Sequence, residues 1–145
     1  MVPLEQLDTD LAAGSIPDLV WITPNLKHTM HDGSVAEGDA WLSGFVPRIL
    51  DSPSWQQNGA LVILWDEGIP SPDPGCCGNP RGGHVPLIVI TPTGSPGYRT
   101  STLLSHYSVL GGIEQAWGLC RLGHTGDADV TVIDELLAPP SGTGG

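Results

Sequence analysis

The sequence predicts an α/β layered fold with a mainly parallel sheet. Helix-like and strand-like segments alternate along the chain. The strand-like segments at residues 60–65 and 86–91 are apolar on both faces, as parallel strands covered by helices are. The 145 residues suit a single globular domain, since a chain near this length buries roughly 70% of its unfolded surface.

The first segments of the chain predict a helix followed by a strand. Leucines recur at helical spacing over residues 4–11, and Gly14 is expected to end this short amphipathic helix. The run DLVWIT at residues 18–23 is rich in β-branched and aromatic side chains, and Pro24 follows it. This composition predicts a buried strand over residues 18–23.

The middle of the chain predicts a second helix, two strands and a long loop. Apolar side chains recur every three or four residues over residues 37–50, so a helix is expected there, kinked or restarted at Pro47. The apolar runs ALVILW and PLIVIT, residues 60–65 and 86–91, predict strands. Between them, residues 68–83 predict a loop longer than the ~12 to 15 residues at which unstructured loops become uncommon.

The last segments predict one more helix and a tail. Ser105 is expected to cap a helix that runs to Trp117, and Gly118 lies just past its end. Residues 138–145, which include the run PPSGTGG, are expected to be disordered. No internal repeat is visible, so the alternation of strands and helices remains the main indication of fold class.

The balance of charges makes nucleic acid and anionic membranes unsuitable partners. Asp and Glu outnumber Lys and Arg by 16 to 5, the formal net charge is −11, and no basic cluster is present. No apolar run approaches the ~18 residues of a membrane span, and the first residues show no signal-peptide pattern. The localisation stays open, as does the pairing of Cys76, Cys77 and Cys120.

Two adjacent carboxylates, Asp66 and Glu67, follow the apolar run LVILW. At the end of a buried strand they repel each other, and few basic residues are available to pair with them. A divalent metal ion bound by carboxylate oxygens and an imidazole, such as that of His84, resolves this conflict. In a parallel sheet, Asn25 and Thr91 follow other strands and are expected at the same edge. The alternative is an exposed turn with both carboxylates in water.

Six short motifs occur in order along the chain: TPN, MHD, GDAW, WDEG, GGHVP and SHYS. In this order and spacing they resemble the bacterial phosphoesterase family of phospholipase C and acid phosphatase enzymes, which belongs to the alkaline phosphatase-like superfamily. The resemblance implies part of a three-layer α/β/α sandwich with a mainly parallel sheet. It covers residues 1–137, which match the C-terminal portion of such a phosphoesterase domain.

The resemblance implies a metal centre and two catalytic histidines. Asp66 and Glu67 match residues that help to hold a catalytic divalent metal ion in these enzymes. His31 of the MHD motif is expected to act as an acid catalyst or to contact a phosphate oxygen, and the ordinary histidine pKa of about 6.5 suits proton transfer near neutral pH. His84 of the GGHVP motif is expected near the site as a second metal ligand or a phosphate contact.

Three further residues are implied as substrate contacts. Asn25 and Asp32 are expected to line or brace the pocket. His106 of the SHYS motif is expected either to contact the substrate or to serve the start of the last helix. His28 and His124 lie in no functional position of these motifs, and lone histidines of this kind are mostly surface or packing residues.

The implied function is hydrolysis of a phosphoric ester, either a small phosphate ester or a phospholipid headgroup. The family's Glu-Asn metal motif and its Ser or Thr nucleophile are absent from the 145 residues. The chain is therefore expected to be truncated, to lack the nucleophile half, and to need that half or self-association for stability. Two alternatives stay open: a non-catalytic remnant that binds phosphate or metal weakly, and a plain acidic α/β domain in which WDEG and GGH are turns.

Overall fold

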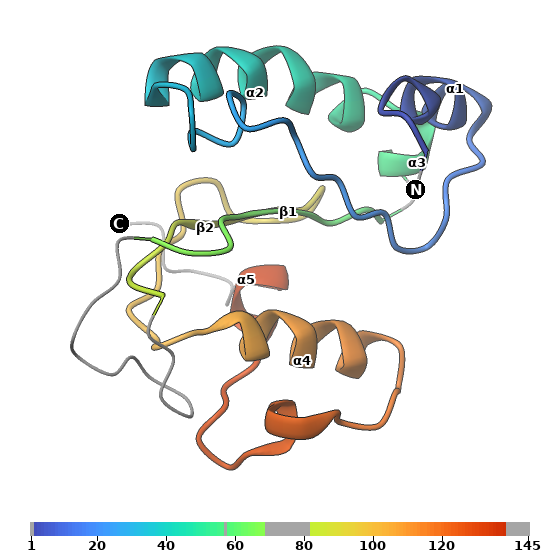
Figure 1. Ribbon diagram of the computed structural model, residues 1–145. Coiled ribbons are helices and arrows are strands. Elements are labelled where there is room, and N and C mark those ends of the chain that lie inside the picture. Colours follow the sequence, from blue (N-terminus) through green and yellow to red (C-terminus); the bar gives the residue numbers. More distant parts are fainter. Residues whose placement is uncertain (1, 57, 69–81, 139–145) are drawn as a thin grey trace. The chain divides into compact units, whose positions relative to one another are not determined.

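The computed structural model describes residues 2–56, 58–68 and 82–138. The chain divides into two compact units, Met1–Ala60 and Leu61–Gly145, and each is described here by itself (Figure 1). Helices dominate the first unit, whereas the second combines two strands with helices. Within the described portion, no helix is both long and apolar enough to cross a membrane.

The described part of the first unit contains three helices, and the two long ones confirm the predicted helices. α1 (Glu5–Ala13) ends at Gly14, whose φ of 64° lies in the left-handed region that favours glycine. α2 (Val35–Leu50) includes Pro47, so this proline does not end the helix. α3 (Pro53–Gln56) is not predicted by the sequence, because four residues are too few for apolar periodicity to show.

The start of α2 is set by a capping box. Ser34 Oγ accepts a hydrogen bond from the Glu37 backbone N–H at 3.2 Å, and the Ser34 N–H donates to Glu37 Oε2 at 2.8 Å. Hydrogen bonds from the Ser34 N–H and the Ser34 hydroxyl to Glu37 Oε2 hold the pKa of this exposed carboxyl below its ordinary value. The sequence predicts a helix start at residue 37, later than the observed start at Val35. The reason is that the prediction is placed by the periodic apolar residues, which lie beyond the cap.

The core of the first unit joins its three helices. Leu11 of α1, Phe45 of α2 and Trp55 of α3 are buried, and α3 contacts both other helices. Arg48 also links α2 to α1, because its guanidinium donates to the Asp8 carboxylate. This core holds α2 in place, and α2 in turn supports the loop that carries the MHD motif.

Residues 18–23 do not form the buried strand that the sequence predicts. They are assigned no strand, and Leu19, Val20 and Trp21 are exposed, with Trp21 80% accessible. Branched and aromatic residues form strands only where their backbone N–H and C=O groups pair with a neighbouring strand. The described residues of the first unit contain no strand. The segment therefore has no strand there to pair with, despite its strand propensity.

The described part of the second unit contains a sheet of two strands, β1 (Leu61–Leu64) and β2 (Leu87–Ile90). Both strands are predicted by the sequence, but they pair antiparallel, with Leu64 opposite Leu87. The expected parallel arrangement is therefore wrong for this pair. Apolar side chains on both faces show that a strand must be covered on both sides, and that requirement is the same for either strand direction.

α4 (His106–Ala116) confirms the helix that the sequence predicts after Ser105. Ser105 occupies the N-cap position with extended backbone, and the helix ends before Gly118, whose φ is 62°. Two short helices follow, η1 (Gly123–Gly126) and α5 (Asp134–Leu137). Neither is predicted by the sequence, since a single turn carries no apolar repeat.

Some predictions concern residues that lie largely outside the described part. The loop predicted over residues 68–83 is described only at its two ends, and the tail predicted over residues 138–145 only at its first residue. Cys120 is an exposed free thiol. Cys76 and Cys77 lie outside the described residues, so the cysteine pairing stays as the sequence leaves it.

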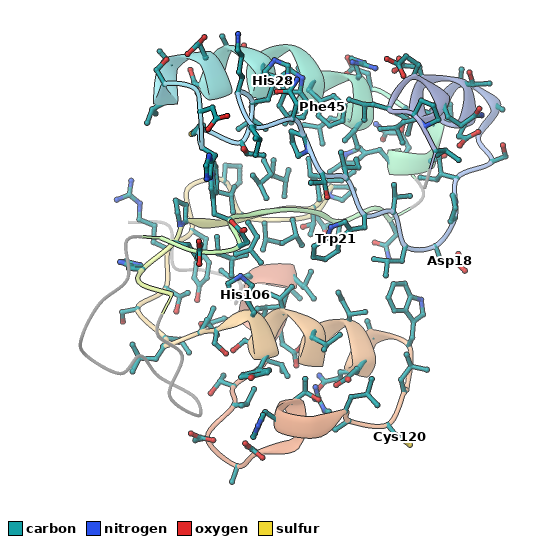
Figure 2. All side chains as sticks on the ribbon, in the orientation of Figure 1. Asp18, Trp21, His28, Phe45, His106 and Cys120 are labelled. Atoms are coloured by element: carbon teal, nitrogen blue, oxygen red, sulfur yellow. The ribbon has the colours of Figure 1, made fainter. Side chains whose placement is uncertain are left out.

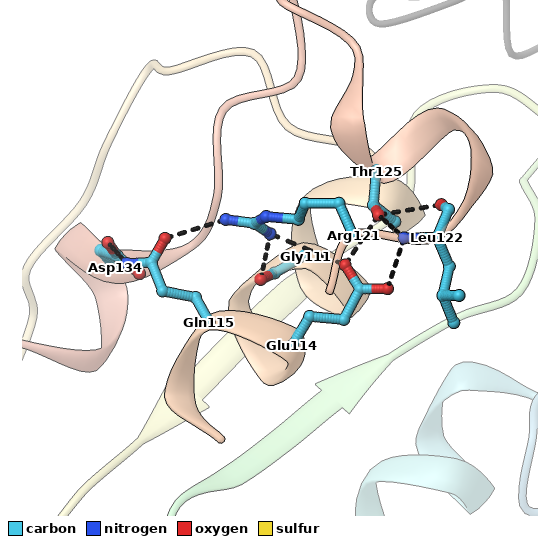
Figure 3. A network of polar contacts seen from close by, with 7 residues as sticks. All are labelled: Gly111, Glu114, Gln115, Arg121, Leu122, Thr125 and Asp134. Carbon is cyan, nitrogen blue, oxygen red and sulfur yellow. Dashed lines mark hydrogen bonds and ion pairs between the residues drawn. The ribbon is translucent and has the colours of Figure 1, made fainter. Parts of the chain in front are cut away.

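A buried carboxylate organises the C-terminal half of the second unit. Glu114 of α4 is only 2% exposed, and its Oε2 accepts a hydrogen bond from Thr125 Oγ1 at 2.7 Å (Figure 3). Its Oε1 accepts from the Leu122 backbone N–H at 3.1 Å, and the Arg121 guanidinium lies 3.8 Å from Oε2. One side chain thus attaches residues 121–125 to α4.

A second carboxylate, that of Glu135 in α5, accepts hydrogen bonds from the segment that follows β2. Tyr98 Oη donates to one oxygen at 3.0 Å and Thr100 Oγ1 donates to the other at 2.8 Å. The hydroxyls of Thr102 and Thr100, and then that of Tyr98, hold the pKa of Glu135 below its ordinary value. The same contact raises the pKa of Tyr98. Glu135 therefore stabilises the fold in its ionised form.

Replacing Glu135 with Gln is expected to make stability less sensitive to acid. A carboxyl whose folded-state pKa lies below its unfolded-state value stabilises the fold above the unfolded pKa, and this contribution is lost as pH falls through the folded pKa. Urea midpoints measured from about pH 6 down to about pH 3 should fall less steeply in Glu135→Gln than in the parent chain. Glu5→Gln, which replaces an exposed acid, is the control; equal slopes in all three proteins would contradict the expectation.

Candidate functional site

The segment between Asn25 and Asp32 is a compact turn in the first unit. The Asn25 side-chain oxygen accepts the backbone N–H groups of Lys27 at 3.2 Å and His28 at 3.0 Å, and the Asn25 carbonyl accepts that of Thr29 at 2.9 Å. Asparagine commonly stabilises turns in this way. Asn25 thus has bonds that brace the loop, which is one of the two roles expected for it.

His31 and Asp32 form a contact at the end of this turn. The distance from His31 Nδ1 to Asp32 Oδ1 is 2.7 Å, and the two side chains are 73% and 56% exposed. A carboxylate beside Nδ1 favours the proton on that nitrogen and directs Nε2 away from the pair. The ring therefore lies oriented and within reach of a ligand from solvent.

Asp66 and Glu67 follow β1 in the second unit, and both are exposed. The next residue, Gly68, donates its N–H to the Gly82 carbonyl at 2.5 Å. A Cβ built on Gly82 would lie 3.5 Å from Glu67 Cβ, and one built on Gly68 would lie 2.9 Å from the His84 carbonyl oxygen. The backbone after β1 therefore runs directly beside residues 82–84, before β2.

The antiparallel pairing changes which residues share an edge of the sheet. Because Leu64 pairs with Leu87, the end of β1 lies beside the start of β2. His84 is thereby brought near Glu67, as the metal hypothesis requires. Thr91 follows the other end of β2, so the expectation that it shares an edge with Asp66 is wrong.

The donor atoms at this edge suit a divalent metal in kind but not in number. Carboxylate oxygens and an imidazole nitrogen are ordinary ligands of divalent ions. Within residues 2–56, 58–68 and 82–138, however, no group of three or more His, Cys, Asp or Glu side chains lies close enough together to hold a metal ion. Asp66, Glu67 and His84 therefore do not form a complete metal centre by themselves.

His106, labelled in Figure 2, is the first residue of α4. His106 Nε2 lies 2.9 Å from the carbonyl oxygen of Trp65. Trp65 directly precedes Asp66, so this bond connects the start of α4 to the end of β1. This geometry matches the expected role at the helix start.

Two residues that support the turn carrying His31 and Asp32 are not among the site residues that the sequence predicts. Met30 has a φ of 68°, which is unusual for a residue other than glycine. Gly38 of α2 lies so close to Met30 that a Cβ there would be 2.4 Å from Met30 Cε. The signal for this contact is the glycine inside a helical pattern, in the GDAW motif.

The chain belongs to the phosphoesterase family. Residues 1–120 match the sequence profile of the Phosphoesterase family. A phosphatidylinositol-3-phosphatase of Mycobacterium tuberculosis is 34% identical to the chain over 115 residues, which are 78% of this chain and 34% of that protein. The motifs that indicate the resemblance therefore lie within a segment that is similar throughout.

Two fungal relatives extend the similarity further along the chain. A probable acid phosphatase of Kluyveromyces lactis is 26% identical over 134 residues, or 89% of this chain and 30% of that protein. An acid phosphatase of Aspergillus fumigatus is 26% identical over 136 residues, or 93% of this chain and 29% of that protein. The chain thus spans about a third of the length of these relatives. No solved structure gives a significant match.

Proposed function

We propose that this chain supplies part of the active site of a phosphoric ester hydrolase. The observation that carries the proposal is the exposed His31–Asp32 pair, on a hydrogen-bonded turn within the segment that matches the phosphoesterase family. Cleavage of a phosphate ester requires a proton for the leaving alcohol, and an oriented imidazole is suited to supply it. In this proposal His31 is the acid catalyst, and Asp32 orients its ring.

Residues at the end of β1 and before β2 are proposed to stabilise charge on the substrate. Asp66 and Glu67 would present carboxylates to a divalent metal ion, and His84 would act as a further ligand or contact a phosphate oxygen. A bound divalent metal would stabilise negative charge on the phosphate oxygens. Further ligands are needed, because the described residues contain no complete group of three. His106 is proposed to hold the end of β1 through its bond to Trp65.

The substrate is proposed to be a phosphate ester, either of a small molecule or of a phospholipid headgroup. The names of the relatives, a phosphatidylinositol-3-phosphatase and acid phosphatases, support this class. The net charge of −11 makes a nucleic acid substrate unfavourable. We further propose that the chain is part of a three-layer α/β/α sandwich of the alkaline phosphatase-like type.

A non-catalytic role is the second candidate, and a specific observation favours it. The 145 residues contain neither the Glu-Asn motif nor a Ser or Thr in the sequence context of the family's nucleophile. A chain with this residue set would keep weak binding of phosphate or metal without turnover. Both candidates therefore predict binding of phosphate or metal, and only the hydrolase predicts turnover.

Metal and phosphate binding test the proposed site. We expect the 145-residue chain to bind Mn²⁺ weakly, and the double variant Asp66→Asn, Glu67→Gln to lose this binding in a calorimetric titration. Asp129→Asn is the matched control, because Asp129 is an exposed acid in the same unit. Equal affinity in the parent chain and the double variant would remove Asp66 and Glu67 from the site.

Turnover separates the hydrolase from the non-catalytic alternative. We expect the chain alone to hydrolyse p-nitrophenyl phosphate feebly at most, with or without added divalent metal, because it lacks the expected nucleophile. A monodisperse sample with metal-dependent turnover in the range of enzymes, about 1 to 10³ per second, would contradict this expectation. The nucleophile would then be one of the chain's own hydroxyl groups, such as Ser101, Thr102 or Ser105.

A further inference from the structure

The loop that carries the His31–Asp32 pair is attached to α2 through the side chain of Met30. Gly38 of α2 is buried, and a Cβ built on it would lie 2.4 Å from Met30 Cε and 2.5 Å from Met30 Cγ. No side chain larger than hydrogen fits at position 38 while Met30 keeps this place. The absence of a side chain at Gly38 therefore creates the space that Met30 fills.

The backbone of Met30 is in a conformation that methionine rarely adopts. Its φ of 68° lies in the left-handed region, where Cβ is crowded by the following carbonyl oxygen. Such a conformation persists only where the surrounding structure determines it, and it is found most often at functional sites. Met30 directly precedes His31, so its backbone sets the direction in which the His31 side chain leaves the loop.

Contacts on either side of Met30 close the loop. A Cβ built on Gly33 would lie 2.3 Å from the Lys27 carbonyl oxygen, so the chain after Asp32 returns close to the start of the turn. The backbone N–H groups of His31 and Asp32 both donate to the Leu26 carbonyl, at 3.1 and 3.0 Å. These bonds leave the His31–Asp32 pair little freedom once Met30 is in place.

A stacked column of rings provides a second attachment to α2. The rings of His28 and Trp41 are 5.1 Å apart and nearly parallel, at 13°, and those of Trp41 and Phe45 are 4.5 Å apart at 14° (Figure 2). His28 lies in the turn, whereas Trp41 and Phe45 are one helical turn apart on α2. The loop is thus held at His28 and at Met30, on either side of Thr29.

We propose that Met30 is a positioning residue for His31: its packing against Gly38 holds the imidazole against Asp32 before any ligand binds. The proposal deepens the proposed function and rests on it for its catalytic meaning, but the geometry it describes exists without substrate. It assigns to the buried glycine of the GDAW motif the role of admitting the Met30 side chain. Asp32 then fixes the orientation of the His31 ring, and the Met30 backbone sets the direction in which that side chain leaves the loop.

The test compares two glycine substitutions in the same helix. Gly38→Ala places a methyl group against Met30, whereas Gly44→Ala is the matched control, because nothing lies within 4 Å of a Cβ at that position. Met30→Gly removes the packed side chain and tolerates the left-handed backbone. In each variant of the full 145-residue chain, nitrogen NMR of the His31 ring, assigned with His31→Gln, reports which ring nitrogen carries the proton. Circular dichroism checks that each variant is folded.

We expect the parent chain and Gly44→Ala to show one tautomer of neutral His31, with the proton on Nδ1. In Gly38→Ala and Met30→Gly, the two nitrogen shifts should move toward the averaged values of an unrestrained histidine. If Gly38→Ala does not fold, the double variant Met30→Gly, Gly38→Ala avoids the collision and should show the same loss. Parent-like His31 shifts in folded Met30→Gly would overturn the proposal and leave Met30 with packing alone. No ester is present in this measurement, so a failure of the hydrolase proposal does not alter its outcome.

Discussion

Replacing Glu114 with alanine is expected to lower the free energy of unfolding by about 3 kcal/mol, because Thr125, Leu122 and Arg121 lose their contacts with a buried carboxylate. Glu114 is 2% exposed and receives hydrogen bonds from Thr125 Oγ1 and the Leu122 N–H. The Arg121 guanidinium, 3.8 Å away, would lose its nearest carboxylate. Its remaining bonds, to the Gly111 carbonyl and to Gln115, compensate only in part.

Urea unfolding of the purified chain measures this effect. Thr125→Val removes the hydroxyl that donates to Glu114 and accepts the Leu122 N–H, while leaving the carboxylate with Leu122 and Arg121, so a smaller loss of about 1 to 2 kcal/mol is expected. Glu5→Ala, in an exposed position of α1, controls for the loss of a glutamate in general. A loss below about 1 kcal/mol for Glu114→Ala would show that the buried carboxylate is not a major source of stability.

Replacing His31 with alanine is expected to lower the turnover of a phosphate ester by about 100-fold or more, as the loss of a general acid does. The assay requires a preparation that hydrolyses the ester in a metal-dependent way. A second measurement does not depend on a nucleophile: His31→Ala should also weaken the binding of inorganic phosphate, if the ring contacts a phosphate oxygen. Unchanged turnover on a natural ester would remove His31 from the proposed catalytic residues.

The chain contains a matched control for this substitution. His124 forms a similar contact, with Nδ1 2.8 Å from Asp127 Oδ2, and its side chain is 65% exposed against 73% for His31. His124 lies outside the family's motifs, and its ring packs against Tyr107. His124→Ala should leave turnover and phosphate binding at the level of the parent chain. An equal fall in both variants would show that the effect on turnover comes from stability.

The long helices could be predicted because their signals are local. Apolar residues three and four positions apart identify α1 and α2, and Ser105 and Gly118 identify the two ends of α4. Gly14 ends α1 as predicted. The short helices α3, η1 and α5 depend on packing against neighbouring elements. Their four residues carry no periodicity that could have been detected.

The strands could be located but not arranged. The apolar runs identify β1 and β2, yet the direction of pairing depends on the path of the chain between them, which composition does not reveal. Residues 18–23 have the composition of a strand and no partner among the described residues of their unit. Pairing is a property of two segments, so the propensity of one segment cannot establish it.

The sequence indicates which residues to propose for the candidate site, but not the contacts that hold them in place. His31 and Asp32 are neighbours in the sequence, and the structure shows their side chains in contact. The glycine inside the helical pattern marks a place of close approach, but neither the positive φ of Met30 nor Met30 as the contacting residue follows from hydrophobic patterning. Whether Asp66 and Glu67 bind a metal ion remains a proposal.

The antiparallel ladder has a consequence for how the family can diversify. Beyond the paired residues Leu64 and Leu87, the Gly68 N–H donates to the Gly82 carbonyl, so the two ends of the connection between the strands already lie together. Each doubling of the length of a connecting loop costs only about 0.6 kcal/mol in closure entropy. A change in the number of residues between Gly68 and Gly82 is therefore expected to cost little, and relatives can differ in length at this point while Asp66, Glu67 and His84 keep their places.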